Sequence, residues 1–368
     1  MSGSSLDFDT DSSNGPAVSS GTSSVVFITR RMKHHAAAAG YDRLQDYIDG
    51  TCIHPVERWS TSHRMVSKLL SFAIARSGSA WYNRRNLVTE LRVTLRWFQG
   101  RKQIFHFLYG ENDFRYLGYL KSIGRGNSIV CTYHTPPEKF KNVVAKSKHL
   151  ARADASIVIS TAQIDLISEI VGQDRVFFVP RGVDVDYFTP AKNNLRQSDK
   201  LQCLFVGEHL RDLDTLIKTA KLLNTERQFS FVVVTRRDRF GQFAGLRNVT
   251  TLSDIDDLQL LELYRNSDLL IMPLLDCTAN NTLLEAMACG LPVVSTDLQG
   301  VRDYVSNDCA ILTPKSDARS LANVLMDLSQ DRHRLERMAE ASRSNALQFR
   351  WETIAEQMRQ VYSAIAKT

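Results

Sequence analysis

The stretch that decides the fold runs from Cys277 to Thr296 and reads CTANNTLLEAMACGLPVVST. It follows the apolar run DLLIMPL (Asp268–Leu274), which predicts a buried strand. A polar loop comes next, then a helix of about two turns, TLLEAMAC, which Gly290 and Pro292 end before the strand VVST. In open α/β sheets, ligands bind beyond the carboxyl ends of strands, where the next helix presents free N–H groups. The polar loop occupies that position.

The same alternation of short apolar runs and helical patterns recurs along the chain. Apolar runs occur at residues 24–29, 103–109, 128–134, 156–160 and 176–180, and after a polar stretch they resume with LQCLFV, FSFVVV, NVTTL and CAILTP. The pattern is typical of β-α units around parallel sheets. A chain of 368 residues also exceeds what one hydrophobic core usually supports. We therefore expect an α/β fold with two Rossmann-like parallel-sheet domains facing each other across a cleft.

The domain boundaries follow from composition. Residues 1–22 are mostly Ser, Gly, Thr and Asp, which predicts a disordered tail. The polar stretch 191–200 is interpreted as a linker between an N-terminal domain, 23–190, and a C-terminal domain, 201–345. The final helix, within 346–368, is expected to pack back toward the N-terminal domain.

Charge and cysteine content restrict the partners and the compartment. The net charge is +6 with a pI near 9.0, which suits phosphates or an anionic membrane surface without indicating nucleic acid. Solvation of the surface explains the same charge equally well. Six cysteines without a CxxC pair favour reduced thiols. With no apolar segment of about 18 residues and no signal region, we expect a cytoplasmic protein that could dock on the inner membrane face.

Residues Thr282 and Glu285 have two interpretations. Their spacing fits a capping box, in which Thr caps a helix and Glu three residues later reaches back. Alternatively, the loop and the helix start bind a ligand. This stretch by itself leaves both interpretations open.

Several segments in order resemble one family. LLEAMACGLPVVSTDLQGVRDYV, LFVGEHLRDLDTLIKTAKLL, VFFVPRGVDVDYFTP and ADASIVISTAQIDLI resemble the retaining GT-B glycosyltransferases of group 1, or family four, in the glycogen-synthase-like superfamily. The resemblance extends from about residue 23 to 366 and is strongest after residue 154. It implies the GT-B architecture and a nucleoside diphosphate sugar as donor substrate.

The resemblance also implies a donor site in the opening stretch. The family's Glu-x7-Glu pair places its second Glu on Glu285, which would bind the ribose of the nucleotide. Its first Glu falls on Cys277, and a thiol cannot accept hydrogen bonds from a sugar as a carboxylate does. Asp276 would take that role. Further contacts are expected from the side chains of Asn280 and Asn281 and from the backbone amides of Asn281, Thr282 and Leu283.

The resemblance places positive charge after the first strand of the C-terminal domain, where the family usually has an Arg and a Lys. Here Glu208 takes the Arg position and Arg211 lies near the Lys position. We expect Arg211 to bind the diphosphate, with His209 assisting. An ordinary solvated arginine is the alternative. The segment TRRDR (Thr235–Arg239) would add charge at the same edge, or form a solvated turn.

The N-terminal domain contributes candidates for the sugar and the acceptor. His134 lies at the carboxyl end of a strand and, by the resemblance, would contact the transferred sugar; the alternative is a structural role at the strand end. Gly40, Tyr41 and Glu111 are candidates for the acceptor side.

Motifs of other chemistries are missing from the sequence. We find no GxxxxGK[ST], GxGxxG after the first strand, HExxH or GxSxG, and no zinc-type His and Cys spacing. We therefore expect a metal-independent, retaining glycosyltransferase without a cofactor, whose acceptor is a sugar, a lipid-linked glycan or a small molecule. A catalytically silent homologue acting as a scaffold, and a nucleotide-sugar epimerase, are the alternatives.

Overall fold

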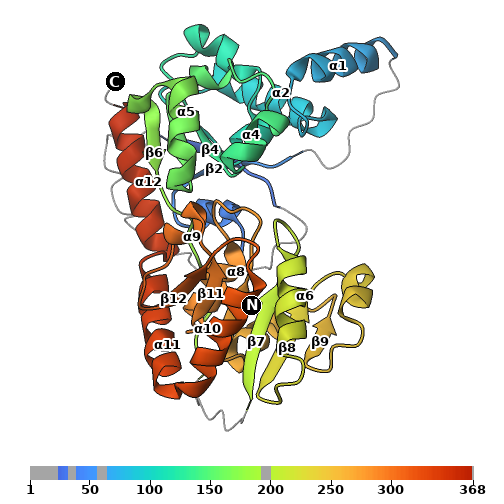
Figure 1. Ribbon diagram of the computed structural model, residues 1–368. Helices are drawn as coiled ribbons and strands as arrows, with labels where there is room; N and C mark the ends of the chain where they lie inside the picture. Colours follow the sequence, from blue (N-terminus) through green and yellow to red (C-terminus); the bar gives the residue numbers. More distant parts are fainter. Residues whose placement is uncertain (1–23, 32–38, 56–63, 192–199, 367–368) are drawn as a thin grey trace, which may run out of the picture.

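The computed structural model describes residues 24–31, 39–55, 64–191 and 200–366. Within these residues the chain forms two parallel sheets of six strands each. The N-terminal sheet has the order β2-β1-β3-β4-β5-β6, and the C-terminal sheet has the order β12-β11-β10-β7-β8-β9. The predicted fold class, two Rossmann-like halves, is confirmed (Figure 1). The predicted tail, 1–22, lies outside the described residues, as does nearly all of the predicted linker, 191–200.

The strands of the N-terminal sheet are β1 (Val25–Ile28), β2 (Gly50–Ile53), β3 (Ile104–Phe107), β4 (Ser128–Tyr133), β5 (Ala155–Val158) and β6 (Val176–Phe178). Those of the C-terminal sheet are β7 (Leu201–Val206), β8 (Phe229–Val234), β9 (Val249–Leu252), β10 (Leu269–Met272), β11 (Val293–Thr296) and β12 (Ala310–Thr313). All residues of β1 and β10 are buried, because helices cover both faces of a parallel sheet.

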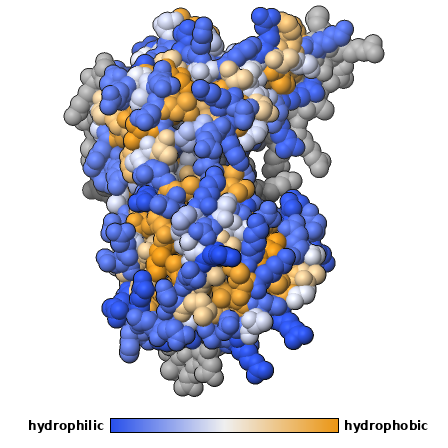
Figure 2. All heavy atoms as spheres, in the orientation of Figure 1, coloured by the Kyte–Doolittle hydropathy of each residue, from blue (hydrophilic) through white to orange (hydrophobic). Residues whose placement is uncertain are grey.

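The helices of the N-terminal half are α1 (Arg64–Ser77), α2 (Arg84–Gln99), α3 (Gly110–Asp113), α4 (Pro137–Val143) and α5 (Ile164–Val171). Those that follow are α6 (Leu213–Leu222), α7 (Asp257–Asn266), α8 (Asn281–Ala288), α9 (Gln299–Arg302), α10 (Ala318–Gln330), α11 (Arg332–Leu347) and α12 (Trp351–Ala366). Short 3-10 helices include Tyr41–Asp46 and Arg237–Phe243. Figure 1 shows α1 projecting from the N-terminal half, and Figure 2 shows apolar patches among the polar side chains of both halves.

Helix α12 returns to the N-terminal half (Figure 1). Its apolar face, including Trp351 and Met358, belongs to the same core as β1, β3 and β4. The Tyr362 hydroxyl lies 2.6 Å from Nδ1 of the buried His106. The chain passes between the halves twice, and Gly182 at one crossing is so close to Trp351 that a Cβ would fall 2.4 Å from its ring. Only glycine fits this contact.

The two sheets meet through the loops at their carboxyl edges. Thr278, after β10, donates a hydrogen bond of 2.8 Å from its hydroxyl to the backbone oxygen of His134, after β4. Asp303, just after α9, accepts hydrogen bonds from the hydroxyls of Ser160 and Thr161, both 2.6 Å long. Because both sheets present their carboxyl edges to this junction, the ligand-binding edge of each domain faces the other.

Candidate active site between the two domains

The N-terminus of α8 lies at the carboxyl edge of the C-terminal sheet. Its N-cap is Asn280, whose side chain makes no capping hydrogen bond. The first backbone hydrogen bond of the helix runs from the N–H of Leu284 to the Asn280 oxygen. The capping-box interpretation of Thr282 and Glu285 is therefore wrong, because Thr282 lies inside the helix and Glu285 bonds elsewhere. Leu283 is fully buried, so only its backbone N–H could serve a ligand.

Glu285 is a buried carboxylate held by a tyrosine. It is 4% exposed, and its Oε2 accepts a hydrogen bond of 2.9 Å from the hydroxyl of Tyr264 on α7. Burial raises the pKa of Glu285 to about 7, although the hydrogen bond from Tyr264 and the positive charges of Arg181 and Arg211 oppose the increase. The carboxyl group is therefore poised to gain or lose a proton near neutral pH.

Arg211 joins the end of β7 to the start of α8. Its Nε donates to the backbone oxygen of Val206, at 3.0 Å, and its Nη1 to that of His209, at 3.2 Å. Its Nη2 donates to Asn280 Oδ1, at 3.2 Å, and to Thr282 Oγ1, at 3.3 Å. The guanidinium is thus fixed beside the positive end of a helix dipole, where an anion would gain from both charges.

The carboxylate of Glu208 binds the loop after β8. It accepts hydrogen bonds from the hydroxyl of Thr235 and from the backbone N–H of Arg236, which ties the end of β7 to the loop after β8. Arg236 itself is paired with Asp238 and exposed. Arg236, Arg237 and Asp238 of the TRRDR segment are exposed, whereas Thr235 is buried, and Glu208 ties the start of this segment to the end of β7.

His134 faces the C-terminal domain from the end of β4. Its ring stacks on Tyr109 with centroids 4.4 Å apart and meets the edge of Tyr41 at 4.9 Å. Its Nε2 lies 2.7 Å from the carbonyl oxygen of Leu108. A carbonyl only accepts, so Nε2 carries the proton and Nδ1 is left as an acceptor. Burial, and then the charge of Arg181, lower the pKa of His134 to about 3, so the ring is neutral.

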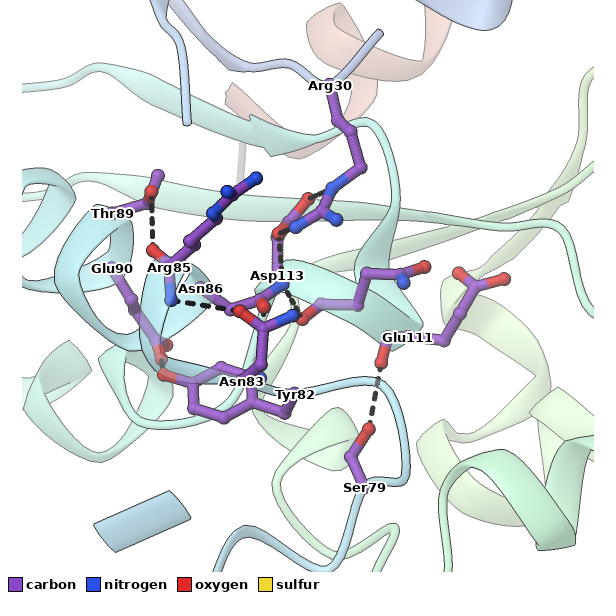
Figure 3. Close-up of polar contacts among 11 residues, drawn as sticks. Arg30, Ser79, Tyr82, Asn83, Arg85, Asn86, Thr89, Glu90, Glu111 and Asp113 are labelled. Carbon is purple, nitrogen blue, oxygen red and sulfur yellow. Dashed lines mark hydrogen bonds and ion pairs between the residues drawn. The ribbon is translucent and has the colours of Figure 1, made fainter. Parts of the chain in front are cut away.

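Glu111, on α3, organises the loop that holds His134. Its Oε1 accepts from the backbone N–H groups of His134 and Thr135, at 2.7 and 2.9 Å, while its Oε2 is buried without a hydrogen-bond partner. Figure 3 shows the Glu111 carboxylate directed away from Asp113, which instead pairs with Arg30. Glu111 thus positions His134, and its second oxygen is left to accept a further hydrogen bond.

The other acceptor-side candidates lie beside this loop. Gly40 adopts φ 115, a conformation that favours glycine, and it precedes the 3-10 helix that begins with Tyr41. Tyr41 is fully buried and contacts His134.

Residues 200–331 match the family model described as Glycosyl transferases group 1. The chain is 27% identical over 257 residues to a D-inositol 3-phosphate glycosyltransferase of Xylanimonas cellulosilytica, a match that covers 63% of this chain and 62% of that protein. It is 25% identical to an MMP alpha-(1->4)-mannosyltransferase of Mycolicibacterium hassiacum over 73% of each chain. Sucrose-phosphate synthase of Thermosynechococcus elongatus has a similar fold, with a TM-score of 0.68, 18% identity and coverage of 93% of this chain and 98% of that one. Anabaena HepE in complex with UDP also has a TM-score of 0.68, at 15% identity, covering 93% of this chain and all of that one.

The family model of group 1 glycosyl transferases thus matches the C-terminal half of the chain, and the two-sheet architecture is the GT-B fold of these solved structures. The chain spans 62% of the length of the Xylanimonas relative, less than two thirds. Within the described residues, every helix is too short or too polar to cross a bilayer. The described residues likewise bring together no three His, Cys, Asp or Glu side chains that could hold a metal ion.

The family's first glutamate is replaced by a residue that packs in the core. Cys277 is 6% exposed and belongs to the core of the C-terminal domain, with its sulfur 3.8 Å from the Gly300 oxygen. Asp276 beside it is half-buried; its Oδ1 accepts from the Cys277 N–H at 2.8 Å, and its Oδ2 is buried without a partner. Burial raises the pKa of Asp276. Asp276, rather than Cys277, therefore has an oxygen to offer a ligand.

His209 is exposed on the loop that contains Arg211, and its contact to Arg211 is through its backbone oxygen. The half-buried Asn281 follows Asn280 at the start of α8.

One residue of this junction was not singled out by the sequence analysis. Arg181, in the segment VFFVPRGVD, is only 7% exposed and lies between the domains. Its position in an apolar run before a glycine was the available signal.

Proposed function

We propose that this protein transfers a glycosyl group from a nucleoside diphosphate sugar to an acceptor, with retention of anomeric configuration and without a metal ion. The observation that carries the proposal is the fixed position of Arg211, hydrogen-bonded to Asn280 and Thr282 at the N-terminus of α8. Relatives named as glycosyltransferases, and a similar fold in complex with UDP, support the same conclusion.

The leaving diphosphate would lie at Arg211 and α8. Negative charge accumulates on the leaving group as the glycosidic bond breaks, and a cation already held in place stabilises that charge without reorganising. The guanidinium and the helix dipole would act on the same phosphate oxygens. Glu285, two residues beyond Leu283 on α8, would accept hydrogen bonds from the ribose hydroxyls.

The transferred sugar would lie between the two domains. Nδ1 of the neutral His134 could accept a hydrogen bond from a sugar hydroxyl, and Oδ2 of Asp276 could accept another from the opposite domain. The backbone link between Thr278 and His134 brings these two groups to the same junction. An acceptor would enter beside Tyr41 and Glu111.

Retention would then depend on positioning rather than on a protein nucleophile. In this proposal the phosphate oxygen of the donor, held by Arg211, stays on the face where the acceptor attacks, and the two domains exclude water. The family resemblance supports this stereochemistry.

Thermal unfolding with nucleotides tests the proposal. A nucleoside diphosphate or its sugar that binds the native state raises the melting temperature, so UDP, GDP, ADP and their sugars are compared. Glu285→Ala should abolish most of that increase and raise the donor KM. Glu262→Ala, on the exposed face of α7, is the matched control and should leave both unchanged. If no nucleotide or nucleotide sugar stabilises the chain and none is turned over, the scaffold alternative replaces the proposal.

A further inference from the structure

Arg181 is anchored at the point where the two domains meet. Its backbone N–H donates a hydrogen bond of 2.9 Å to the hydroxyl of Tyr304, from the C-terminal domain. That hydroxyl donates in turn to the backbone oxygen of Ile159, at the end of β5, at 2.6 Å. The arginine backbone is therefore held by both domains at once.

The guanidinium of Arg181 is buried but not paired. Its Nε and Nη2 are inaccessible to solvent and have no hydrogen-bond partner in the described part of the chain. No carboxylate among the described residues forms an ion pair with it, whereas Arg30 and Arg43, for example, each pair with an aspartate. Arg115 offers a comparison: it is also 7% exposed and its Nε also lacks a partner, but its Nη1 donates to the backbone oxygen of Lys146 and to the ring of His149.

The residues around Arg181 come from both sides of the candidate active site. Its charge contributes to the pKa values of His134, Tyr41, Tyr109 and the buried Asp42 in the N-terminal domain. It also contributes to the pKa of Glu285 on α8 in the C-terminal domain. The charge of the guanidinium therefore acts on the proposed sugar contact in one domain and on the proposed ribose contact in the other.

An unpaired cation in this position requires an explanation. An arginine does not give up its proton in proteins, so it cannot become neutral as a buried lysine can. Leaving its N–H groups without acceptors costs free energy, which a bound anion would offset. Neutral sugar hydroxyls would satisfy the N–H groups but not the charge. A phosphate-type oxyanion satisfies both, since its oxygens match the fork of the guanidinium.

We propose that Arg181 binds a phosphate-type oxyanion of a substrate held between the two domains. The inference rests on the proposed function for the identity of that substrate. Two sources share this chemistry: the diphosphate of the donor, and a phosphoryl group on the acceptor. Arg181 differs from Arg211 in that the protein supplies acceptors for Nε and Nη2 of Arg211 but not for those of Arg181.

Titration of the full chain with inorganic pyrophosphate and inorganic phosphate tests the inference. The wild-type protein should bind at least one of them, and Arg181→Gln should weaken that binding by at least about tenfold, the loss expected for charged hydrogen bonds. Arg181→Lys keeps the positive charge but not the forked guanidinium, so its anion affinity should lie between those of the wild type and Arg181→Gln. Arg115→Gln, the matched control with equal burial, should bind the anion as the wild type does. Equal affinity of Arg181→Gln and wild type, within twofold, would overturn the inference, as would a wild type that binds neither anion.

The melting temperature of each variant without ligand shows whether a loss of anion binding is caused by unfolding. If Arg181 serves a ligand, Arg181→Met removes a buried charge whose Nε and Nη2 have no acceptor, and the free protein should melt at the same or a higher temperature. A lower melting temperature in both the Met and the Lys variants, with unchanged anion affinity per folded molecule, would show that the residue is structural and overturn the inference.

The two sources are separated by adding a nucleoside diphosphate that stabilises the wild type. Arg181 binds the donor if inorganic phosphate competes with the nucleoside diphosphate and if Arg181→Gln lowers the affinity for the nucleoside diphosphate but not for the nucleoside. If phosphate still binds to the nucleotide-saturated wild type but not to Arg181→Gln, it binds an acceptor phosphoryl group. Phosphate binding through Arg181 without any nucleotide binding would refute the proposed function alone. Normal sugar transfer and anion binding by Arg181→Gln would refute only the present inference.

Discussion

Replacing Glu285 with glutamine tests separately how the buried carboxylate affects the stability of the protein and how it affects nucleotide binding. The substitution keeps the shape of the side chain and leaves an oxygen to accept the hydrogen bond from Tyr264. It removes a group whose pKa burial raises from an ordinary 4.5 to about 7 in the folded protein. The folded state therefore holds a proton on Glu285 that the unfolded chain has already lost, and this occurs between pH 4.5 and about pH 7.

The sign and size of the effect follow from linkage. As the pH rises through this window, Glu285 lowers the free energy of unfolding of the wild type, and the loss is complete above the folded pKa. The glutamine variant has no such loss, because its side chain does not ionise. With about 1.4 kcal/mol for each pH unit, a change from 4.5 to about 7 corresponds to about 3 kcal/mol. Glu285→Gln should therefore be more stable than the wild type by about 3 kcal/mol at pH 8, and by about 1 kcal/mol at pH 5.

Urea unfolding at pH 5, 6, 7 and 8 measures this difference, and the same samples give nucleotide affinity at pH 8. We expect the variant to gain stability and lose nucleotide affinity, the combination typical of a group kept for binding. A stability difference that does not vary with pH would refute the linkage argument. A variant that is less stable at every pH, with unchanged nucleotide affinity, would show that the carboxylate only supports the packing of α8 against α7.

Three further substitutions test separate parts of the molecule. Arg211→Gln should weaken nucleoside diphosphate binding by about tenfold or more while leaving the nucleoside unaffected, and equal losses for both in calorimetric titrations would contradict a diphosphate contact. Gly300→Ala would place a Cβ 2.1 Å from the backbone oxygen of Cys277, so the melting temperature should fall by several degrees; Gly241→Ala, with open space around its Cβ, should not change it. Phe72 on α1 is 60% exposed, and if the basic protein docks on membranes, Phe72→Ser should reduce sedimentation with anionic vesicles at low salt. A wild type that stays in the supernatant at low salt would end that hypothesis.

The fold was predictable because its signals are local. Strands buried on both faces are short and continuously apolar, as in VVFI of β1 and LLIM of β10, and helices between them show the expected spacing. The strand that the sequence analysis missed, β2, reads GTCI and is largely exposed at the sheet edge. Its formation depends on pairing with β1, a contact between segments that the local pattern does not reveal.

The candidate site was predictable only in part, because burial and pairing are set by contacts between distant segments. The sequence marked Glu285 and Arg211, but it could not show that Tyr264 holds the former or that Asn280 and Thr282 hold the latter. The capping box failed for the same reason: Thr282 accepts a hydrogen bond from Arg211, about 70 residues away along the chain.

Arg181 shows most clearly where a sequence pattern reaches its limit. An arginine beside a glycine between two domains is ordinarily a solvated residue. Only the tertiary structure shows that it is anchored by Tyr304, 123 residues away in the chain, which also binds Ile159. Arg211 and Arg181 differ in the hydrogen-bond acceptors that the protein supplies to them, which the sequence does not reveal. The first has its hydrogen bonds supplied by the protein, so it is in position before a ligand arrives, whereas the second lacks them in the described structure. A ligand that accepts hydrogen bonds from Arg181 would bind a residue whose backbone is fixed by both domains. Its affinity would therefore depend on how the two domains are placed relative to each other.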